Sequence, residues 1–598
     1  MKKKQPILGI DLGTTYSLAC LADQQDRIHF FTPEGEGEYL VPSVFLHRGG
    51  GEVLIGSAIH AEEPFLKDPR EVIRNVKRSM DRNYPEGALP PESFISGGRS
   101  FLPYQVSGHI LRALKRAAER EFETPPPDSF HAEFDFQGSI TGAVVTVPAY
   151  FGPREREATR DAAVFAGFTE DQVILLDEPV AAALSMGLQN QPGRRLIMVV
   201  DLGGGTCDIT ALQVGQGVTD GGFRELGRIG DNKLGGIDID ELIVKATIDS
   251  GPIDDYSIEE EGTLIWDSGK LQRLHADAER AKKNLCQAIQ QDRRSHFESI
   301  RWLEREKNEF FETELTGAWF LEETDDILEY VVHLCDFLLS NIDRSEAGLR
   351  GKRRGLRWDE MDMVYMVGGG ARIPHLRNKL IERLGGDQKK LSIMPKPQQA
   401  VAEGAALYAS MLAEGKTLKG INNSRCPCEI GYSGKTVPKV SLLNRLKEYL
   451  PFASPVPTTG TGKPTFFPLI RSNALLNDPE QRTKKVDAPI LSSNYRSITI
   501  SIYQKFVRRF PRDVVNGSKE SDQTSLTGDS QGGVNFQYRS LRRLRISVPE
   551  NSPETFVTIQ ITYAQNHEIT IKVQHGEQVI EERVAKDAFV ALFDFQDQ

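Results

Sequence analysis

The chain has 598 residues, which is too many for one hydrophobic core, and at roughly 100–200 residues per domain we expect three or more structural units. Apolar residues make up 39% and charged residues 26%, a balance typical of a globular chain and unlike that of a disordered one. The formal net charge is -11, which argues against a nucleic-acid binder because such a protein needs a basic face.

The N-terminal region and the cysteines predict a cytoplasmic protein. The stretch MKKKQPILGIDLG begins with lysines, but Asp11 interrupts its apolar run, so we expect no signal peptide. No run of about 20 apolar residues is present, and we therefore expect no membrane span. Six cysteines in a chain of this length favour reduced thiols over a disulfide framework. Cys426 and Cys428 form the only close pair, and without a second pair or a nearby histidine they are a weak metal-site candidate.

Residues 1–415 alternate strand-like and helix-like segments, an order that indicates an α/β domain with mostly parallel strand pairing. The helical segments carry apolar stripes at spacings of three and four, as in SGKLQRLHADAERAKKNLCQ. The predicted elements, in chain order, are a strand at 143–148, a helix at 152–168, a strand, turn and helix at 173–188, a helix at 268–287, and a strand, glycine turn and helix at 362–376.

The composition of the chain changes after residue 415. Residues 416–429 are polar and rich in turn-forming residues, which predicts a linker. In the β-sandwich domain that we expect at 430–598, three segments alternate apolar and polar residues with a period of two, as antiparallel strands with one buried face do. We expect a long mobile loop at 511–535. Only about 20 residues follow the last clear strand, so we expect no helical bundle at this end.

Two glycine turns raise the main question about function. ILGIDLGTTYS ends an apolar run at Asp11 and continues with Gly13 and hydroxyl residues, and IMVVDLGGGTCD repeats this scheme around Asp201. Glycine after a strand lets the backbone approach a phosphate closely, and successive N–H groups form an anion nest. A carboxylate beside a phosphate is repelled unless a divalent cation lies between them, so the two aspartates suggest Mg²⁺ held largely through waters.

The alternative is that each glycine turn is only a tight bend from a strand to a helix. A third glycine turn at Gly368, Gly369 and Gly370 makes this alternative less attractive, because three such turns in one chain point to a common ligand. We therefore predict two related half-sites that face each other across a cleft and hold one polyphosphate from both sides.

The motifs of this chain resemble those of the seventy-kilodalton heat-shock (Hsp70) chaperones, a family of the actin-like ATPase superfamily. The resemblance covers residues 7–412 and continues more weakly through 429–585. It implies an α/β fold with an actin-like, ribonuclease-H-like ATPase domain of two lobes at 1–415, followed by a β-sandwich domain that binds substrate at 430–598. The motifs that carry it, in order, are GIDLGTTYS, AVVTVPAYF, DEPVAAAL, DLGGGTCD, GDNKLGG, ERAKKNL and VGGGARIP.

The resemblance also implies roles for individual residues. It implies ATP or ADP together with Mg²⁺, with Asp11 and Asp201 around the metal. The residues implied in catalysis are Lys77, Glu178, Asp201, Thr206 and Asp208. The residues implied in nucleotide binding are Asp11, Gly13, Thr14, Thr15, Tyr16, Gly203, Gly204, Gly205, Thr206, Gly235, Gly236, Glu279, Lys282, Lys283, Cys286, Gly369, Gly370 and Arg372. Pro148 and Arg156 match positions that relay the nucleotide state to the second domain.

Several of these assignments have a structural alternative. Lys77 lies in the basic stretch RNVKRSMDR, and taken alone it would be interpreted as a solvated lysine. Glu279 and Lys282 are spaced for an ion pair on a helix surface, worth roughly a few tenths of a kcal/mol. Arg372 matches the arginine that stacks on the adenine, but it could instead cap neighbouring carbonyl groups.

The sequence departs from the Hsp70 pattern at several positions. Cys286 stands where a serine is common near the ribose, and Gln398 stands in place of an aspartate after the last β-α turn. Ile174 replaces an arginine that serves J-domain partners, and Asp177 replaces an asparagine. The leucine-rich linker is replaced by LKGINNSRCPCEIGY, which has little apolar area for docking on the ATPase domain. The expected absence of a helical lid is a further departure.

These observations leave two main functions open. The first is an ATP-dependent chaperone of the stress response that hydrolyses ATP slowly to control its binding of unfolded or extended polypeptides, with a J-domain protein and a nucleotide exchange factor as candidate partners. The second is an ATP-binding switch with little turnover that holds one dedicated partner through its β domain. Retained Lys77 and Thr206 favour the first function, and the polar linker favours the second. A sugar kinase or filament protein of the superfamily is disfavoured by the β-rich tail.

Overall fold

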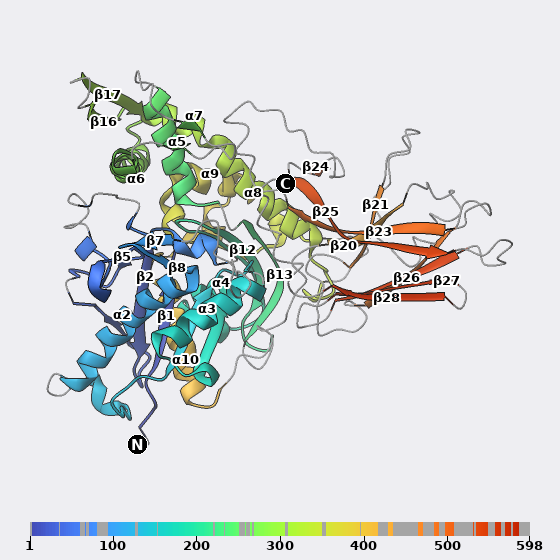
Figure 1. The fold of residues 1–598 in the computed structure, drawn as a ribbon, viewed down its shortest axis with the longest axis horizontal. Coiled ribbons are helices and arrows are strands. Elements are labelled where there is room, and N and C mark those ends of the chain that lie inside the picture. The colour runs from blue at the N-terminus through green and yellow to red at the C-terminus, as the bar shows by residue number, and fades with distance from the viewer. Residues whose placement is uncertain are drawn as a thin grey trace. The chain divides into compact units, whose positions relative to one another are not determined.

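The computed structural model divides the chain into two compact units, which we describe separately (Figure 1). The first contains residues 1–338 and 357–421, and the second contains residues 339–356 and the described strands beyond residue 422. The structure describes residues 3–416, except for 35, 60–65, 67–70, 81–93, 126–128, 152, 219–221, 232–233, 250–256, 259–263, 266–267, 305–308, 350–354 and 395, and the segments 429–434, 465–470, 483–489, 497–507, 530–531, 534–547, 556–563, 569–575 and 578–584.

The first sheet of the N-terminal unit has the strand order β10-β9-β1-β2-β3, and the short β4 pairs with β2. Strands β1, β9 and β10 are parallel to one another, whereas the β1–β2 and β2–β3 pairs are antiparallel. The strands are β1 (Ile7–Leu12), β2 (Tyr16–Ala22), β3 (Ile28–Phe31), β4 (Val41–Pro42), β9 (Gly142–Val147) and β10 (Val173–Asp177).

The second sheet repeats this arrangement with the strand order β13-β12-β11-β18-β19. Strands β11, β18 and β19 are parallel, and the β11–β12 and β12–β13 pairs are antiparallel. The strands are β11 (Arg195–Leu202), β12 (Cys207–Val214), β13 (Phe223–Asp231), β18 (Met363–Val367) and β19 (Leu391–Ile393). The two sheets are therefore two copies of one topology.

Each main path of five strands has two parallel and two antiparallel pairs, so the prediction of mostly parallel pairing is wrong. The first two glycine turns close hairpins, since Leu12 pairs with Ser17 and Leu202 pairs with Cys207. The alternative interpretation, a bend from strand to helix, is thus wrong for both. A buried apolar run does not reveal the direction of its neighbour, because strands buried on both faces lack the alternation that marks an exposed hairpin.

Two helices form a hydrophobic core with the first sheet, namely α2 (Pro103–Glu123) and α3 (Pro153–Ala166). The helix predicted at 152–168 buries an alanine face, because Ala158, Ala162 and Ala163 are at most 2% exposed and belong to the same core as Leu8 of β1. Small side chains on this face let the helix approach the sheet closely.

Two further helices, α4 (Glu178–Ser185) and α10 (Ala400–Ala413), join the sheets through one core. That core contains Val144 of the first sheet and Val199 of the second. A Cβ on Gly9 would lie 2.1 Å from the backbone nitrogen of Ala406, so α10 packs with its backbone directly against β1. Helix α4 begins immediately after β10, which places Glu178 at the end of a buried strand.

The rest of the described N-terminal chain adds helices and short hairpins around these sheets. The predicted apolar stripe of α6 is confirmed where its side chains are described, because Leu274, Ala278 and Leu285 are buried. The helices are α5 (Gly236–Asp249), α6 (Ser268–Gln290), α7 (Gly317–Glu323), α8 (Asp325–Asn341) and α9 (Pro374–Arg383). The strand pairs are β5 (Phe45–His47) with β6 (Val53–Ile55), β7 (Phe94–Ser96) with β8 (Arg99–Phe101), β14 (Ser257–Ile258) with β15 (Leu264–Ile265), and β16 (Phe297–Glu304) with β17 (Glu309–Thr316).

Short 3₁₀ helices connect many of these elements, and two of them, η4 and η9, contribute to the site described below. They are η1 (Gly49–Gly51), η4 (Val76–Ser79), η5 (Phe130–Glu133), η6 (Glu170–Gln172), η7 (Leu188–Asn190), η8 (Trp358–Glu360), η9 (Gly369–Arg372) and η10 (Gln388–Lys390). None of the helices that the structure describes combines the length and the apolar character needed to cross a lipid bilayer.

The described strands of the second unit form two antiparallel sheets, with strand orders β21-β20-β23-β25-β24 and β22-β26-β27-β28, which confirms the predicted β-domain class. On β27 the alternation of period two is visible directly, because Ile571 and Val573 are fully buried while Gln574 is exposed. The strands are β20 (Glu429–Gly434), β21 (Thr465–Ile470), β22 (Thr483–Pro489), β23 (Ser497–Val507), β24 (Ser530–Gln531), β25 (Val534–Ser547), β26 (Phe556–Tyr563), β27 (Ile569–His575) and β28 (Gln578–Val584).

Three predictions lie wholly or mostly outside the described residues. The linker at 416–429 is described only at its ends, and Cys426 and Cys428 fall within its undescribed part. The loop predicted at 511–535 is described only where β24 and the start of β25 lie, so its last residues form strands.

Candidate functional site

A cleft of about 2000 Å³ lies in the N-terminal unit and is lined by all three glycine turns. Among its lining residues are most of those that the sequence predicts for a nucleotide site, namely Asp11, Gly13, Thr14, Thr15, Tyr16, Lys77, Glu178, Asp201, Gly203, Gly204, Thr206, Gly236, Glu279, Lys282, Lys283, Cys286, Gly369, Gly370 and Arg372. The fold thus brings to one place residues that are distributed from the first strand to the loop after β18.

Three of the predicted residues, Gly205, Gly235 and Asp208, do not line the cleft but support it. A Cβ on Gly235 would lie 2.6 Å from the backbone nitrogen of Gly205, so this glycine lets the start of α5 approach the second turn. Asp208 is 1% exposed, and its Oδ1 accepts a hydrogen bond from the N–H of Tyr150 at 2.9 Å. These residues support the backbone of the cleft without lining it.

The two hairpin turns lie against each other. A Cβ on Gly204 would lie 2.0 Å from the Oγ1 of Thr15, and a Cβ on Gly205 would lie 2.6 Å from the Cγ2 of Thr14. Contacts below 3.0 Å are essentially never seen for a real Cβ, so no other residue fits at these glycines without displacing the threonines. The glycines of the second turn therefore leave room for the threonine side chains of the first turn.

The third glycine turn approaches the second sheet in a similar way. Gly368 has a φ of 73°, which an L side chain rarely adopts, and its Cβ would lie 2.4 Å from the Oδ1 of Asp201. A Cβ on Gly370 would lie 2.5 Å from the side chain of Leu202. The chain after β18 thus passes directly beside the end of β11, where Asp201 lies.

Four carboxylates gather at the two hairpin turns and at the start of α4. The register of the β11–β12 hairpin places Asp201 directly opposite Asp208. Burial, reinforced by the charge of Glu178, raises the pKa of Asp11 and of Asp208 to about 7 and raises the pKa of Asp201 well above its ordinary value. The positive charge near these carboxylates therefore does not offset the effect of their burial.

Lys77 supplies one cation to this cluster. Its Nζ donates to the Oε1 of Glu178 at 2.5 Å, and the residue is only 5% exposed, so the alternative of a solvated lysine is wrong. Burial alone lowers the pKa of an amine, but the charges of Glu178 and Asp11 outweigh it and raise the pKa of Lys77. The chain enters η4 through Asn75, whose left-handed φ of 56° is one that asparagine tolerates.

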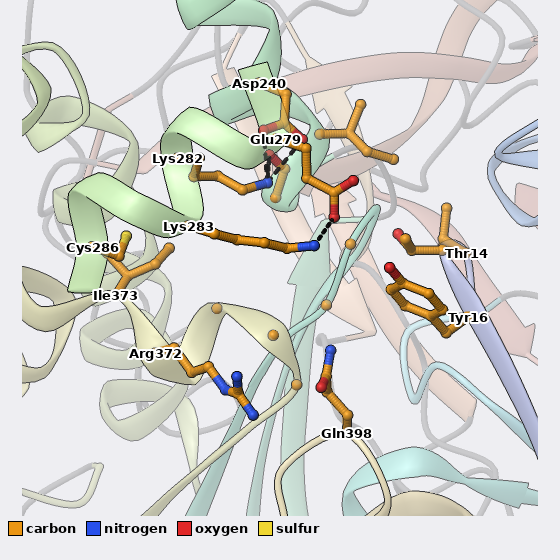
Figure 2. Close-up of a pocket in the computed structure, with 18 of the residues that line it drawn as sticks. Thr14, Tyr16, Asp240, Glu279, Lys282, Lys283, Cys286, Arg372, Ile373 and Gln398 are labelled. Atoms are coloured by element: carbon orange, nitrogen blue, oxygen red, sulfur yellow. Dashed lines mark hydrogen bonds and ion pairs between the residues drawn. The ribbon is translucent and has the colours of Figure 1, made fainter. Parts of the chain in front are cut away.

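The other end of the cleft is built from α5 and α6 (Figure 2). Lys282 donates to the carbonyl oxygen of Gly236 at 2.9 Å and to the Oδ2 of Asp240 at 2.8 Å. Lys283 pairs with Glu279 at 2.7 Å. The alternative of a surface ion pair between Glu279 and Lys282 is therefore wrong. Lys282 pairs with Asp240 of α5, and Glu279 pairs with Lys283 instead.

Cys286, Arg372 and Gln398 line the same end of the cleft. Cys286 is buried, and this burial raises the pKa of its thiol to about 12, so it stays protonated and is a weak hydrogen-bond donor. Arg372 ends the turn η9, and Figure 2 shows its guanidinium near Gln398. This end offers apolar and cationic surface suited to a flat aromatic ring.

Comparison with known proteins decides the family. The Hsp70 protein family model matches residues 7–422, which is more than half of the chain. The chain belongs to the Hsp70 family. Among similar curated proteins are the chaperone proteins DnaK of Thermosipho melanesiensis and of Thermosipho africanus, each 29% identical over 418 residues. These alignments cover 70% of this chain and 61% of each relative, so the chain matches less than two thirds of their length.

One departure from the Hsp70 pattern is visible as a network of ion pairs. Asp177 accepts a hydrogen bond from Arg156 at 2.5 Å through one oxygen and from Arg228 at 2.9 Å through the other. Arg156 also donates to the carbonyl oxygens of Phe151 and Ala149. An asparagine could not pair with two guanidinium groups in this way, because only one of its two terminal atoms is an acceptor.

Ile174, another departure, and Pro148, which matches the family, have simpler structural settings. Ile174 lies in β10, where it pairs with Val144 of β9, and its side chain packs against the core that α4 and α10 share. Pro148 follows β9, and its carbonyl oxygen accepts the N–H of Phe151 at 3.0 Å. The neighbouring Val173 accepts a hydrogen bond at its carbonyl oxygen from Arg160 at 2.7 Å, so a guanidinium group lies beside the backbone of β10.

The carboxylates at the two hairpin turns fit an Hsp70 magnesium site in part. Their donors are carboxylate oxygens, and the Oδ2 of Asp208 is buried without a hydrogen-bond partner. In the part of the chain that the structure describes, no three His, Cys, Asp or Glu residues lie close enough together to hold a metal ion directly. Mg²⁺ that keeps most of its waters needs only one or two carboxylates, so Asp11 and Asp201 fit such a hydrated ion.

Sequence reasoning missed several residues of this site. Asp240, which lines the cleft and pairs with Lys282, and Arg78, which contacts the second glycine turn, were not singled out. The charge of Asp240 at the fourth position after the glycine pair of GDNKLGG was a usable signal, since carboxylates are favoured near a helix N-terminus. Arg78 lies in the basic stretch RNVKRSMDR, which does not reveal its contact with the second glycine turn.

Proposed function

We propose that the chain binds ATP, hydrolyses it slowly, and uses that reaction to control its binding of unfolded or extended polypeptide segments. The observation that supports this most strongly is the contact between the two glycine turns beside a buried acidic cluster that holds Lys77. A polyphosphate is the ligand that suits this arrangement, because both turns can offer backbone N–H groups while Lys77 provides a cation.

In this proposal the residues of the phosphate end share the work of the reaction. The turns Gly13–Tyr16 and Gly203–Thr206 hold the phosphate chain from two sides, and the hydroxyl groups of Thr14, Thr15 and Thr206 add hydrogen bonds. Mg²⁺, when bound beside Asp11 and Asp201, supplies charge stabilisation to the phosphate oxygens.

Lys77 and Glu178 form the pair that positions the attacking water. Lys77 is anchored by Glu178 at 2.5 Å, and a γ-phosphate that enters the cleft competes with Glu178 for the ammonium group. Glu178, once partly released, accepts a hydrogen bond from the water and takes its proton. Asp208 interacts electrostatically with both of them and, with a pKa raised to about 7 by burial and by Glu178, is a second acceptor for this proton.

The adenosine end binds by stacking and by the charges of α6. Arg372 stacks on the base, while Lys282 and Lys283 contact the ribose and the nearer phosphates. Burial holds the Cys286 thiol protonated with a pKa of about 12, so it contributes packing more than hydrogen bonding. We expect a moderate affinity for the nucleoside as a result.

The partners follow from the same proposal. Extended polypeptides add to an edge of the β domain, through backbone hydrogen bonds and pockets for alternate side chains. A J-domain protein and a nucleotide exchange factor are the candidate regulators, acting in the cytoplasm and in the response to stress. The proposed domain boundaries are 1–415 for the ATPase, 416–429 for the linker and 430–598 for the polypeptide-binding domain.

A single-turnover ATPase assay with and without an unfolded polypeptide tests this proposal. The expected result is slow hydrolysis of prebound ATP that requires Mg²⁺ and speeds up when the polypeptide is added. Adding candidate sugars in parallel tests for phosphate transfer, and we expect no additional ADP from them. Absence of hydrolysis together with tight ATP binding would contradict the chaperone proposal.

That last outcome would support the second candidate, an ATP-binding switch with little turnover. One observation favours it, which is that Lys77 is held by Glu178 in a buried ion pair and must leave that pair to reach a phosphate. In this case the β domain holds one dedicated partner, and a screen of unrelated unfolded peptides would find no binding.

A further inference from the structure

Arg78, the residue after Lys77, connects the two halves of the cleft. The first half is built from the first sheet and η4, and the second half from the second sheet and α5. Its Nε donates to the carbonyl oxygen of Gly205 at 2.8 Å, and its Nη2 donates to the Oδ2 of Asp238 at 2.6 Å. Both partners belong to the second half, since Gly205 lies in the β11–β12 turn and Asp238 lies in the first turn of α5. The arginine and the aspartate side chains are 11% and 13% exposed, so water competes little for these bonds.

The base of Arg78 is anchored in the first half. Its turn, η4, begins at Val76 and is followed by Met80, which are 2% and 1% exposed and belong to the core of the first sheet. The neighbouring Lys77 points to Glu178, whereas Arg78 points to the second glycine turn. One short turn therefore fixes the position of Lys77 relative to the turn that would hold the phosphates.

The second glycine turn is held by its carbonyl oxygens. The N–H groups of Gly236 and Ile237, at the start of α5, donate to the carbonyl oxygens of Gly203 and Gly204 at 3.0 and 2.8 Å. The third carbonyl oxygen, that of Gly205, accepts from Arg78 of the opposite half. A carbonyl oxygen that faced a phosphate would repel it, so these three bonds orient the turn for an anion.

Asp238 links the arginine to the same turn. Its Oδ2 accepts the N–H of Gly235 at 2.6 Å as well as the Nη2 of Arg78. Gly235 in turn lies directly behind Gly205. Arg78 thus contacts the second turn once directly and once through the start of α5, and its guanidinium is suited to such a fork of two acceptors where a lysine is not.

We propose that Arg78 is a positioning residue that holds the second glycine turn in register with Lys77 and slows the release of nucleotide from the cleft. This inference rests on the proposed nucleotide binding. The halves must separate for a nucleotide held by both turns to leave, and separation breaks the bonds of Arg78 to Gly205 and Asp238. Affinity changes of this kind appear mainly in the dissociation rate.

The test is the dissociation of a fluorescent ADP from the full chain, chased with unlabelled ADP. Arg78→Ala is expected to speed release about tenfold, because it removes two charge-assisted hydrogen bonds of a buried arginine. Arg78→Lys keeps the charge but not the fork, and we expect an intermediate rate. Asp238→Asn should also speed release, and the double variant Arg78→Ala with Asp238→Asn should release hardly faster than Arg78→Ala.

The matched control is Arg120→Ala, which removes an exposed arginine that pairs with Glu34 on the first half, away from the cleft. It should leave the release rate within twofold of that of the parent chain. A merely structural role for Arg78 would lower thermal stability without this rate pattern, and Arg78→Lys and Asp238→Asn keep the test available if Arg78→Ala does not fold.

Two results would overturn the inference in different ways. Release rates for Arg78→Ala, Arg78→Lys and Asp238→Asn that all match the parent, with normal nucleotide binding, would remove the role of Arg78 and leave the proposed function intact. A parent chain that binds no nucleotide at all would remove the proposed function and this inference with it.

Discussion

The two sheets of the N-terminal unit have one topology but different chemistry at the matching hairpin. The turn of the first sheet carries the side chains of Thr14 and Thr15, whereas the turn of the second is a run of three glycines. A Cβ on Gly204 would lie 2.0 Å from Thr15, so a second copy of the first turn could not face the original. Two identical turns would collide where one side-chain turn and one glycine turn fit together.

The charges are divided unequally as well. The first half contributes Asp11 and, from η4, Lys77, and the second half contributes Asp201 with Asp208 directly opposite it. Glu178, at the start of the helix that joins the sheets, holds the lysine. The difference teaches that a duplicated fold places equivalent backbone on both sides of the cleft, while a few charged side chains make the two sides unequal.

The largest expected effect comes from adding a side chain to the glycine turn of the second sheet, which makes it more like the turn of the first sheet. Gly204→Val adds a side chain where no space exists, and it should push Thr15 away and reduce hydrolysis by at least about 100-fold, since a displacement of about 1 Å can cost that much. Gly37→Val is the matched control, because nothing lies within 4 Å of its Cβ and it does not line the cleft. Equal ATPase rates for the two variants would contradict the fit between the turns.

The second test removes the cation that only the first half supplies. Lys77→Ala should keep nucleotide binding and reduce single-turnover hydrolysis by about 100-fold, since the water loses its positioning group. Lys115→Ala is the matched control, because it removes a lysine that also pairs with a glutamate, Glu119, at 2.6 Å but lies outside the cleft. Hydrolysis by Lys77→Ala at the parent rate would show that the asymmetry has no catalytic role.

The third test compares the carboxyl groups of the two halves by their pH dependence. Burial and Glu178 raise the pKa of Asp11 and of Asp208 from 3.8 to about 7, so the folded chain holds these protons while the unfolded chain has lost them. The free energy of unfolding should therefore fall as the pH rises from about 4 to about 7. Asp11→Asn and Asp208→Asn should each flatten this slope by up to about 1.4 kcal/mol per pH unit, measured by chemical denaturation without nucleotide.

Asp23 is the control with the opposite sign. Although burial opposes it, hydrogen bonds from His29 and Arg27 lower the pKa of Asp23 to about 2, so its stabilising effect is lost only as the pH falls below about 4. Asp23→Asn should leave the slope between pH 4 and 7 unchanged. If the free energy of unfolding varies with pH equally in Asp11→Asn, Asp208→Asn and Asp23→Asn, burial of the acidic cluster has no effect on stability.

The smallest effect is expected at the adenosine end, which α6 and η9 of the second half provide. Cys286→Ser replaces a weak donor with a hydroxyl group at a buried position of the cleft, and nucleotide binding should tighten about threefold. Cys335→Ala, a buried thiol outside the cleft, is the control. Titration with fluorescent nucleotide measures both, and a weaker affinity for Cys286→Ser would mean that the ligand does not approach this position.

Much of the site could be predicted from the sequence because its requirements are local. A glycine turn after a buried strand has a recognisable composition, and the apolar stripe of α6 follows from helical period alone. The aspartates at the strand ends, Asp11 and Asp201, are part of the same motifs. These features identify the Hsp70 family, and the matching family model confirms it.

The pairing of these local elements was decided only by tertiary structure. The direction of a strand depends on the neighbour that the fold gives it. The ion pair of Lys77 with Glu178 and the bonds of Arg78 to the opposite half join segments that are roughly 100 residues apart or more in the sequence. The same holds for Lys282, which pairs with Asp240 of another helix and not with Glu279 of its own. Composition and period describe what one segment buries, whereas the partner of a charged side chain depends on which other segment the fold brings within about 3 Å of it.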